Sequence, residues 1–290
     1  MTDEETKYDA VIVGAGVSGL FMFYKLKNMG LSVLVIEKSD ELGGTWNWNR
    51  YPGARCDIPS LEYSYQFDEE LQQEWSWSEK YSAGPEILEY LNHVADKFDL
   101  KDYINFEEEV IQAKFNEDSC LWSVSTNKQK YVTKFCIFAT GCLSIPNKPE
   151  IPGLESFEGE LLHTATWPRE EQNFRGKNVA IIGTGSSSIQ TIPEIAKDVK
   201  NLYVFQRTPN YSIPSNNGPM DKDVEAQVKG RYSEFRKENS LNGFGLASLS
   251  DEALISESDL EEVISQFEEN WNTSGLAFFG GYADIPVDVD

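Results

Sequence analysis

The stretch Gly14-Ala15-Gly16-Val17-Ser18-Gly19 lies between an apolar run, Tyr8–Val13, and a helical pattern over Val17–Asn28. A further apolar run, Leu31–Ile36, follows and ends in Glu37. Glycines let such a loop turn tightly, and the start of the helix offers N–H groups to a pyrophosphate. An acid about 20 residues further on accepts hydrogen bonds from ribose hydroxyls. The segment is therefore predicted to be a dinucleotide-binding strand–turn–helix–strand unit. A solvated strand-end carboxylate is the alternative for Glu37.

A second loop, Gly183-Thr184-Gly185-Ser186-Ser187-Ser188, stands between the predicted strands Val179–Ile182 and Asn201–Gln206. Gln206 holds the place that Glu37 holds in the first unit, and Arg207 follows it. An acid repels a 2′-phosphate, whereas arginine binds one with two hydrogen bonds. We therefore expect FAD at the first loop and NADP at the second. Ser188 replaces the third glycine, which puts close helix–strand packing there in doubt.

The composition fits a folded protein of one or two domains, since 40% of the 290 residues are hydrophobic. The net charge of -23 predicts no nucleic-acid partner and no anionic membrane partner. The sequence shows no signal peptide and no apolar run long enough to span a bilayer, so a cytoplasmic location is expected. Cys56, Cys120, Cys136 and Cys142 form no C-x-x-C pair, which predicts no metal site and no redox dithiol. We expect four reduced, mostly buried thiols.

The remaining pattern predicts an α/β fold with two Rossmann-like dinucleotide-binding domains and a partial helical insertion, both sheets being incomplete. Pro146, Pro149 and Pro152 form a stiff connector, so we place an FAD-binding domain at 1–149. The hinge with the first part of the NADP-binding domain then covers 150–214, and the helical insertion covers 215–290. The expected further helices are Glu86–Phe98, Lys222–Asn239 and Leu260–Asn270, and the expected further strands are Phe106–Phe115, Cys120–Thr126 and Tyr131–Phe138.

Two longer stretches carry a resemblance to a known family. Phe157–Pro168 lies between the glycine loops and resembles F-x-G-x-x-x-H-x-x-x-W-P, the fingerprint of type I Baeyer–Villiger monooxygenases. The run from Leu42 to Asp57 resembles the second motif of that family, G-G-x-W-x-x-x-x-Y-P-G-x-x-x-D, at every fixed position. The run Ile137–Gly141 resembles the A-T-G step at which such flavoenzymes leave the flavin domain. Taken alone, an isolated histidine in a linker is more often a core residue, and an aromatic-rich turn segment is more often packing than a cofactor site.

The resemblance implies a monooxygenase that uses FAD, NADPH and O₂. Through a peroxide at flavin C4a, one oxygen atom is inserted next to a ketone carbonyl, which gives an ester or a lactone. Asp57 matches the active-site carboxylate of the family, which pairs with an arginine. His163 and Trp167 would couple domain rotation to catalysis, Arg55 and Cys56 would lie along the nicotinamide channel, and Cys142 would lie near the flavin edge. Family members run on beyond the part that matches, so we expect that these 290 residues lack that arginine and are not a competent oxygenase by themselves.

The candidate site residues follow from the two loops and from the resemblance. The candidate catalytic residues are Asp57 and His163. The candidate cofactor-binding residues are Gly14, Gly16, Ser18, Gly19, Glu37, Gly44, Thr45, Trp46, Arg55, Cys56, Asp57, Tyr63, Val110, Thr184, Gly185, Ser186, Ser187, Ser188, Ile189, Gln190, Arg207 and Thr208.

Three other functions share some of these features. A flavin-containing monooxygenase acting on nitrogen or sulfur has both loops and the hinge, but usually has another aromatic residue where Trp167 stands. A disulfide reductase with two nucleotide sites needs a redox cysteine pair, which is absent. A truncated nucleotide-binding fragment that serves as an interaction module is the third alternative. The substrate is expected to be a small ketone, and the oligomeric state is left open.

Overall fold

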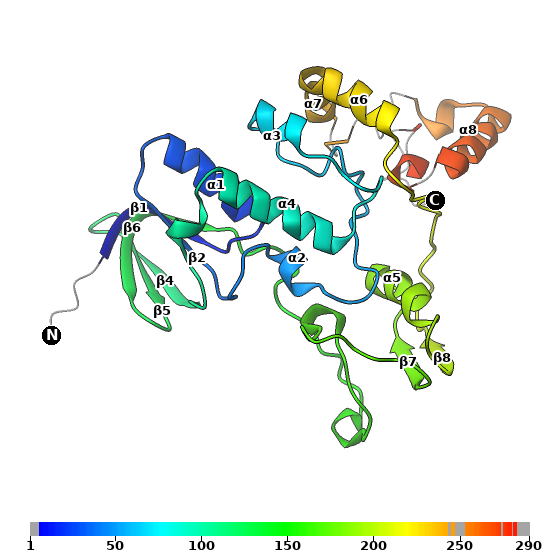
Figure 1. The fold of residues 1–290 in the computed structure, drawn as a ribbon, viewed down its shortest axis with the longest axis horizontal. Helices are drawn as coiled ribbons and strands as arrows, with labels where there is room; N and C mark the ends of the chain where they lie inside the picture. The colour runs from blue at the N-terminus through cyan, green and yellow to red at the C-terminus, as the bar shows by residue number, and fades with distance from the viewer. Residues whose placement is uncertain (1–5, 243–244, 247–252, 274, 280, 283–290) are drawn as a thin grey trace. The chain divides into compact units, whose positions relative to one another are not determined.

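The computed structural model describes residues 6–242, 245–246, 253–273, 275–279 and 281–282 (Figure 1). The chain divides into two compact units, each formed by two separate stretches of sequence. Unit 1 consists of Met1–Pro52 and Gly84–Phe174, and unit 2 consists of Gly53–Ala83 and Arg175–Asp290. The run from Leu42 to Asp57 is therefore divided between the two units after Pro52.

Unit 1 is built on a six-stranded sheet with the strand order β3-β2-β1-β6-β5-β4. Strands β3, β2, β1 and β6 are parallel, whereas β5 runs antiparallel to both β6 and β4. The strands are β1 (Thr6–Val13), β2 (Val33–Ile36), β3 (Ile104–Asn105), β4 (Val110–Asn116), β5 (Leu121–Thr126) and β6 (Lys130–Phe138). The predicted α/β class is confirmed, because a parallel β1–α1–β2 crossover forms the start of the chain.

The helices of unit 1 contribute apolar faces to its core. The predicted helix Val17–Asn28 is confirmed as α1 with the same bounds, and Leu20 and Phe23 are its large buried residues. The predicted helix Glu86–Phe98 is confirmed as α4 (Gly84–Lys97), which buries Ile87, Leu91 and Val94. The shorter elements are α2 (Thr45–Trp48) and three 3₁₀ turns, η1 (Lys101–Tyr103), η2 (Leu154–Ser156) and η3 (Thr164–Thr166).

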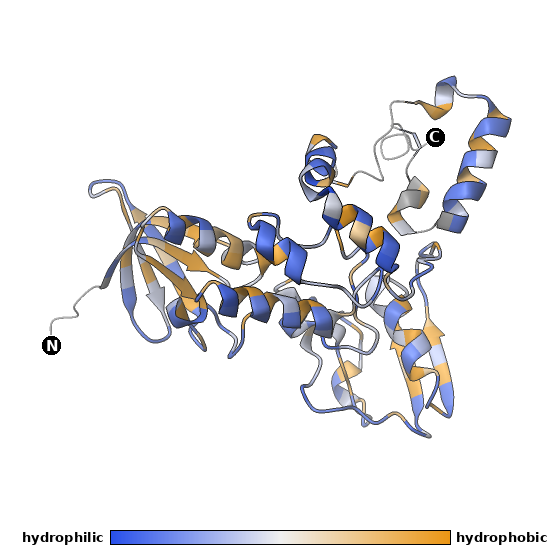
Figure 2. Cartoon of the chain, turned by 45° about the horizontal axis from the view of Figure 1, so that its top comes forward, coloured by the Kyte–Doolittle hydropathy of each residue, from blue (hydrophilic) through white to orange (hydrophobic). Residues whose placement is uncertain are grey.

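The core of unit 1 lies on the parallel strands. All four residues of β2 are buried, and Val11 and Ile12 of β1 have no exposed surface. Strands covered on both faces read as continuous apolar runs, which is why Tyr8–Val13 and Leu31–Ile36 were recognisable in the sequence. Figure 2 shows apolar residues along the strands of the chain.

The predicted strand Phe106–Phe115 is wrong over its first residues. Strand β4 begins only at Val110, because Glu107 has a left-handed backbone with φ 54°. The segment before β4 instead bonds to the end of β2, since the N–H of Glu107 donates to the carbonyl of Ser39 and the N–H of Glu108 donates to the carbonyl of Glu37. These contacts depend on the tertiary fold and leave no local signal in the sequence.

Unit 2 contains a second β–α–β crossover. Strands β7 (Asn178–Ile182) and β8 (Asn201–Phe205) pair in parallel, and helix α5 (Ser186–Ile195) connects them. The other elements are α3 (Glu69–Glu74), α6 (Lys222–Gly230), α7 (Tyr232–Leu241), η5 (Ile255–Glu257), α8 (Leu260–Thr273) and η6 (Gly275–Phe279). No helix among the described residues is long and apolar enough to cross a membrane.

The prediction of one helix over Lys222–Asn239 is wrong. The chain forms α6 and α7, which meet at Arg231 with φ −134° and ψ 30°, values outside the α-helical range. Gly230 ends α6, and glycine weakens a helix interior by about 1 kcal/mol relative to alanine. The predicted helix Leu260–Asn270 is confirmed as α8, which extends to Thr273.

The expectation of mostly buried cysteines is also wrong. All four thiols are unpaired, but only Cys56 is buried, whereas Cys120 and Cys142 are exposed and Cys136 is half-buried. Cys120 lies in the turn before β5 with φ 53°, and Cys142 follows the end of β6. Turns and strand ends at the surface expose their side chains whatever the residue type.

Candidate functional site

The first glycine loop has no room for side chains at two of its glycines. Gly14 has φ 105°, and a Cβ atom there would lie 2.6 Å from the carbonyl oxygen of Ala139. A Cβ atom on Gly19 would lie 1.9 Å from the carbonyl oxygen of Gly14. Helix α1 therefore starts directly against the loop. No side chain caps this end of α1, and the amides of its first turn, including that of Ser18, lie at a helix N-terminus, which suits a pyrophosphate.

Glu37 shapes this loop with its carboxylate. One oxygen, Oε2, accepts a hydrogen bond from the N–H of Ala15 at 2.7 Å, and Oε1 accepts one from the N–H of Ser39 at 2.8 Å. Glu37 is only 5% exposed, so the alternative of a solvated strand-end carboxylate is wrong. A carboxylate oxygen can accept more than one hydrogen bond, so the group retains capacity for ribose hydroxyls.

The glycines of the second motif lie against the same loop. The N–H of Gly43 donates to the carbonyl of Ala15 at 3.0 Å. A Cβ atom on Gly44 would lie 3.0 Å from the Cα atom of Gly16, so the two backbones are in direct contact. Thr45 and Trp46 then open helix α2. The structure thus brings Gly14, Gly16, Gly19, Glu37 and Gly44 together, whereas Val110 lies at the start of β4 and packs against the core of the sheet.

The second glycine loop repeats the backbone course of the first. Gly183 has φ 107° and donates its N–H to the carbonyl of Phe205 at 2.8 Å, as Gly14 donates to Ile36 at 2.8 Å. Helix α5 begins at Ser186, so Ser186, Ser187 and Ser188 supply its first-turn amides, followed by Ile189. Gly185 is the N-cap residue. This second helix start also suits a pyrophosphate.

Ser188 is accommodated because the second loop is looser than the first. A Cβ atom on Gly183 would lie 3.9 Å from Oγ of Ser188, an ordinary van der Waals distance. At the matching place in the first loop, a Cβ atom on Gly19 would meet backbone at 1.9 Å. The space at Gly183 supports the doubt about close helix–strand packing at Ser188.

Thr184 is held by Gln206 and Asn210, which were not among the candidate binding residues. Its Oγ1 accepts hydrogen bonds from Nε2 of Gln206 at 2.9 Å and from Nδ2 of Asn210 at 3.3 Å. A hydroxyl oxygen has two acceptor positions, so these bonds leave its O–H free to donate to a ligand. The equal offset of Gln206 and Glu37 was the available signal for Gln206, but no sequence pattern indicated Asn210.

Arg207 and Thr208 follow directly after β8 and are exposed. Among the described residues, none forms an ion pair with Arg207. Its neighbour Gln206 bonds to Thr184 of the second glycine loop. An exposed guanidinium is a suitable group for a phosphate monoester.

Asp57 lies in unit 2, next to helix α5. Its Oδ1 accepts a hydrogen bond from Nε2 of Gln190 at 3.2 Å. The protein atoms packed around the carboxyl raise its pKa, and the bond from Gln190 acts in the opposite direction. Because part of the residue is open to solvent, water limits the cost of its charge. Asp57 is therefore a partly desolvated anion held by a neutral donor.

The neighbours of Asp57 in the sequence are engaged within the protein. The guanidinium of Arg55 pairs with Glu79 at 2.6 Å and donates to the carbonyl of Tyr81 at 2.8 Å. Cys56 is buried, and burial raises the pKa of its thiol to about 11, so the thiol is protonated at neutral pH. Tyr63 donates its backbone N–H to the carbonyl of Pro59 at 2.9 Å in the following turn.

His163 joins the proline-rich connector to the segment that follows it within unit 1. Its Nδ1 accepts a hydrogen bond from the N–H of Ala165 at 3.1 Å, so His163 is the N-cap residue of η3. The proton of the neutral ring then lies on Nε2, which donates to the carbonyl of Asn147 at 3.2 Å. Trp167 packs against Phe174, with ring centroids 6.1 Å apart.

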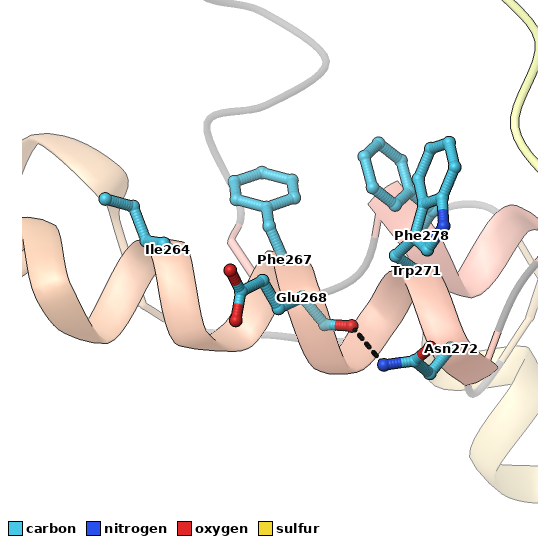
Figure 3. Close-up of a pocket in the computed structure, with 6 residues that line it drawn as sticks. All are labelled: Ile264, Phe267, Glu268, Trp271, Asn272 and Phe278. Atoms are coloured by element: carbon cyan, nitrogen blue, oxygen red, sulfur yellow. Dashed lines mark hydrogen bonds between the residues drawn. The ribbon is translucent and has the colours of Figure 1, made fainter.

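A separate open pocket of about 460 Å³ lies on α8 and η6 in unit 2 (Figure 3). Figure 3 shows the rings of Phe267, Trp271 and Phe278 on this surface. The carbonyl of Glu268 accepts a hydrogen bond from Asn272 at 2.9 Å there. None of the predicted site residues lines this pocket.

Comparison with known proteins identifies the family to which the chain belongs. The family model described as pyridine nucleotide-disulphide oxidoreductase matches residues 11–274, so the chain belongs to this family. The chain is 43% identical over 232 residues to an acetone monooxygenase (methyl acetate-forming) of Gordonia sp. (strain TY-5), covering 80% of this chain and 44% of the relative. It is 39% identical over 284 residues to a Baeyer–Villiger monooxygenase of Pseudooceanicola batsensis, covering 96% of this chain and 52% of the relative. The resemblance that the motifs indicated is confirmed.

Solved structures give the same result. A structure of an oxidised steroid monooxygenase bound to NADP superposes with a TM-score of 0.93 at 44% identity. The match covers 98% of this chain and 55% of the other chain. The chain thus spans about half the length of the proteins that it matches.

Proposed function

We propose that the chain provides the two nucleotide sites of an enzyme that uses FAD, NADPH and O₂ to insert one oxygen atom next to a ketone carbonyl, giving an ester or a lactone. The contrast between the two sites carries this proposal. At equal places, the first site has the buried acid Glu37 and the second has the neutral Gln206 followed by the exposed Arg207. Sites of opposite charge preference select two different dinucleotides.

The proposed domain boundaries are those inferred from the sequence. The FAD-binding domain covers 1–149, the hinge with the first part of the NADP-binding domain covers 150–214, and the helical insertion covers 215–290.

FAD lies at the first glycine loop. The N-terminal amides of α1 bind the pyrophosphate, while Glu37 accepts hydrogen bonds from the ribose. The backbone of Gly44 approaches the loop closely enough to confine the ligand, and Trp46 borders it. When bound, the flavin supplies the redox chemistry with O₂, and the protein orients it and excludes water.

NADPH lies at the second loop. The amides of Ser186 and Ser187 and the hydroxyl of Thr184 donate to its phosphates, and Ser188, whose N–H already donates to the carbonyl of Gly185 at 2.9 Å, borders them with its side chain. Arg207 binds the 2′-phosphate, and Asp57 supplies a negative charge beside the nicotinamide end. His163 fastens the connector to the hinge and takes no part in bond chemistry. The four unpaired thiols suit a cytoplasmic enzyme.

A product assay tests the reaction. Because these 290 residues are not expected to be a competent oxygenase by themselves, the assay uses the natural gene product in full. It is supplied with FAD, NADPH, O₂ and an aryl or cyclic ketone, and with a thioether in a parallel reaction. An ester or lactone with coupled NADPH oxidation supports the proposal. A sulfoxide without any ester assigns the chain to the nitrogen- and sulfur-oxidising flavin monooxygenases, and the absence of bound flavin by absorbance contradicts both functions.

A further inference from the structure

Helix α5 is joined to Asp57 by a hydrogen bond from the side chain of Gln190. Gln190 lies in α5 just after the second glycine loop, and its amide faces the segment 55–57. Its Oε1 accepts the N–H of Arg55 at 3.3 Å, while its Nε2 donates to the carbonyl of Arg55 at 3.1 Å and to Oδ1 of Asp57 at 3.2 Å. Both N–H bonds of the amide are thus used.

The orientation of this amide follows from its partners. A reversed amide would place its oxygen against the carbonyl of Arg55 and the carboxylate of Asp57, which are both acceptors, and its NH₂ against the N–H of Arg55. All three contacts would then be repulsive. The donor side of Gln190 therefore faces Asp57.

The backbone also holds the two segments together. Gly53 has φ 80°, and a Cβ atom there would lie 2.3 Å from the carbonyl oxygen of Gln190. The chain before Asp57 is thus in direct contact with α5. A residue with a side chain at position 53 would displace the backbone of α5. The amide bonds of Gln190 to Arg55 then fix the register between this segment and the helix.

The other ionisable groups near Asp57 do not neutralise it. Arg55 is engaged by Glu79. Burial raises the pKa of Cys56 and of Tyr81, and the charge of Asp57 raises both further. Glu62 also acts on Tyr81. Among the described residues, Gln190 is the side chain that donates a hydrogen bond to Asp57.

We propose that Gln190 is a positioning residue that orients the carboxylate of Asp57 and favours its charged form, and so connects the nucleotide loop of unit 2 to the active-site carboxylate. This inference deepens the proposed function, because the proposed role of Asp57 depends on its charge. A nucleotide bound at Thr184–Ser188 would contact the start of α5, the helix that also carries Gln190.

The test measures Asp57 directly, without turnover. The protein is labelled with ¹³C at the aspartate carboxyls, the signal of Asp57 is assigned with Asp57→Asn, and its titration is followed by NMR. In Gln190→Met, which keeps the length of the side chain but removes the donor, the titration midpoint of Asp57 moves to higher pH. The matched control is Gln206→Met, which removes an amide bonded to Thr184 in the same loop and leaves the midpoint unchanged.

A second variant keeps the test decisive if Gln190→Met does not fold. Gln190→Glu retains the acceptor for Arg55 and places a carboxylate beside Asp57, so the midpoint moves upward as well. An unchanged midpoint in the folded Gln190 variants overturns the inference and makes Gln190 a nucleotide contact or a packing residue. Because the measurement needs neither flavin nor ketone, a failed product assay leaves its result intact, and the two proposals fail separately.

Discussion

The carboxylate of Glu37 accepts a hydrogen bond from the N–H of Ala15 at 2.7 Å and so ties the end of β2 to the first glycine loop. The two residues are 22 positions apart, so this bond joins the loop to a distant part of the chain. An acid that was predicted as a ribose ligand therefore also builds the loop. Its replacement affects the fold as well as the ligand.

We expect Glu37→Gln to lower the free energy of unfolding by about 1–3 kcal/mol, because glutamine has one acceptor oxygen and would place an NH₂ group against a buried N–H donor. Urea unfolding measures this change. Glu41→Gln is the control, since Glu41 is exposed and its carboxylate pairs with Arg50 and Arg169. A change of less than about 1 kcal/mol is expected there. Equal losses in the two variants would show that the buried bonds of Glu37 contribute little.

The two glycine loops should respond differently when glycine and serine are exchanged at their third position. Gly19→Ser places a side chain within 1.9 Å of backbone, so we expect loss of the folded first loop and of FAD binding. Ser188→Gly removes a side chain that has room, and as a glycine in a helix it lowers the unfolding free energy by only about 1 kcal/mol. Thermal unfolding and flavin absorbance check both. A tolerated Gly19→Ser would contradict the close packing of α1.

Arg207 is expected to select NADP⁺ over NAD⁺. A charge-assisted hydrogen bond contributes about 1.5–3 kcal/mol, so Arg207→Ala weakens NADP⁺ binding about tenfold to a hundredfold and leaves NAD⁺ binding nearly unchanged. Isothermal titration calorimetry with both nucleotides measures this. Lys200→Ala removes the same charge from the other end of β8 and should change neither affinity. Equal losses for both nucleotides in Arg207→Ala would make the arginine a structural residue.

Helix and strand bounds could be predicted from the sequence where the contacts that fix them are between residues close together in the chain. Val17–Asn28 was predicted with its observed bounds because the loop glycines and the apolar period mark both ends. The start of β4 was not predictable, since Glu107 and Glu108 bond to the end of β2, far away in the sequence. For the same reason the motif around Asp57 identified the carboxylate but not its attachment to Gln190, which lies 133 residues further along the chain.

His163 should stabilise the connector rather than the flavin site. His163→Ala removes the acceptor for the N–H of Ala165 and the donor to Asn147. Each bond contributes about 0.5–1.5 kcal/mol, so hydrogen exchange at the Ala165 amide becomes about threefold to tenfold faster. Bound FAD is expected to stay unchanged. His93→Ala, which alters the other histidine, is the control, and release of FAD from His163→Ala would show that this residue supports the flavin site instead.

The last prediction concerns the stability cost of Asp57. The surrounding protein raises the pKa of this carboxyl above its unfolded value of about 3.9. A carboxyl whose pKa is raised by folding binds protons more tightly in the folded state, so its contribution to stability is present below pH 4 and is lost as the pH rises through the folded pKa. At neutral pH the ionised Asp57 therefore destabilises the fold.

Asp57→Asn should remove this cost, because asparagine carries no charge and its oxygen can still accept the hydrogen bond from Gln190. We expect the variant to exceed the wild-type free energy of unfolding at pH 7, by less than about 1 kcal/mol because water reaches the carboxylate. The difference should shrink as the pH is lowered and vanish near pH 3. Urea unfolding across this range measures it, with Asp118→Asn on the exposed turn before β5 as the control. A wild-type protein that is the more stable of the two at pH 7 would show that the bond from Gln190 outweighs the desolvation of Asp57.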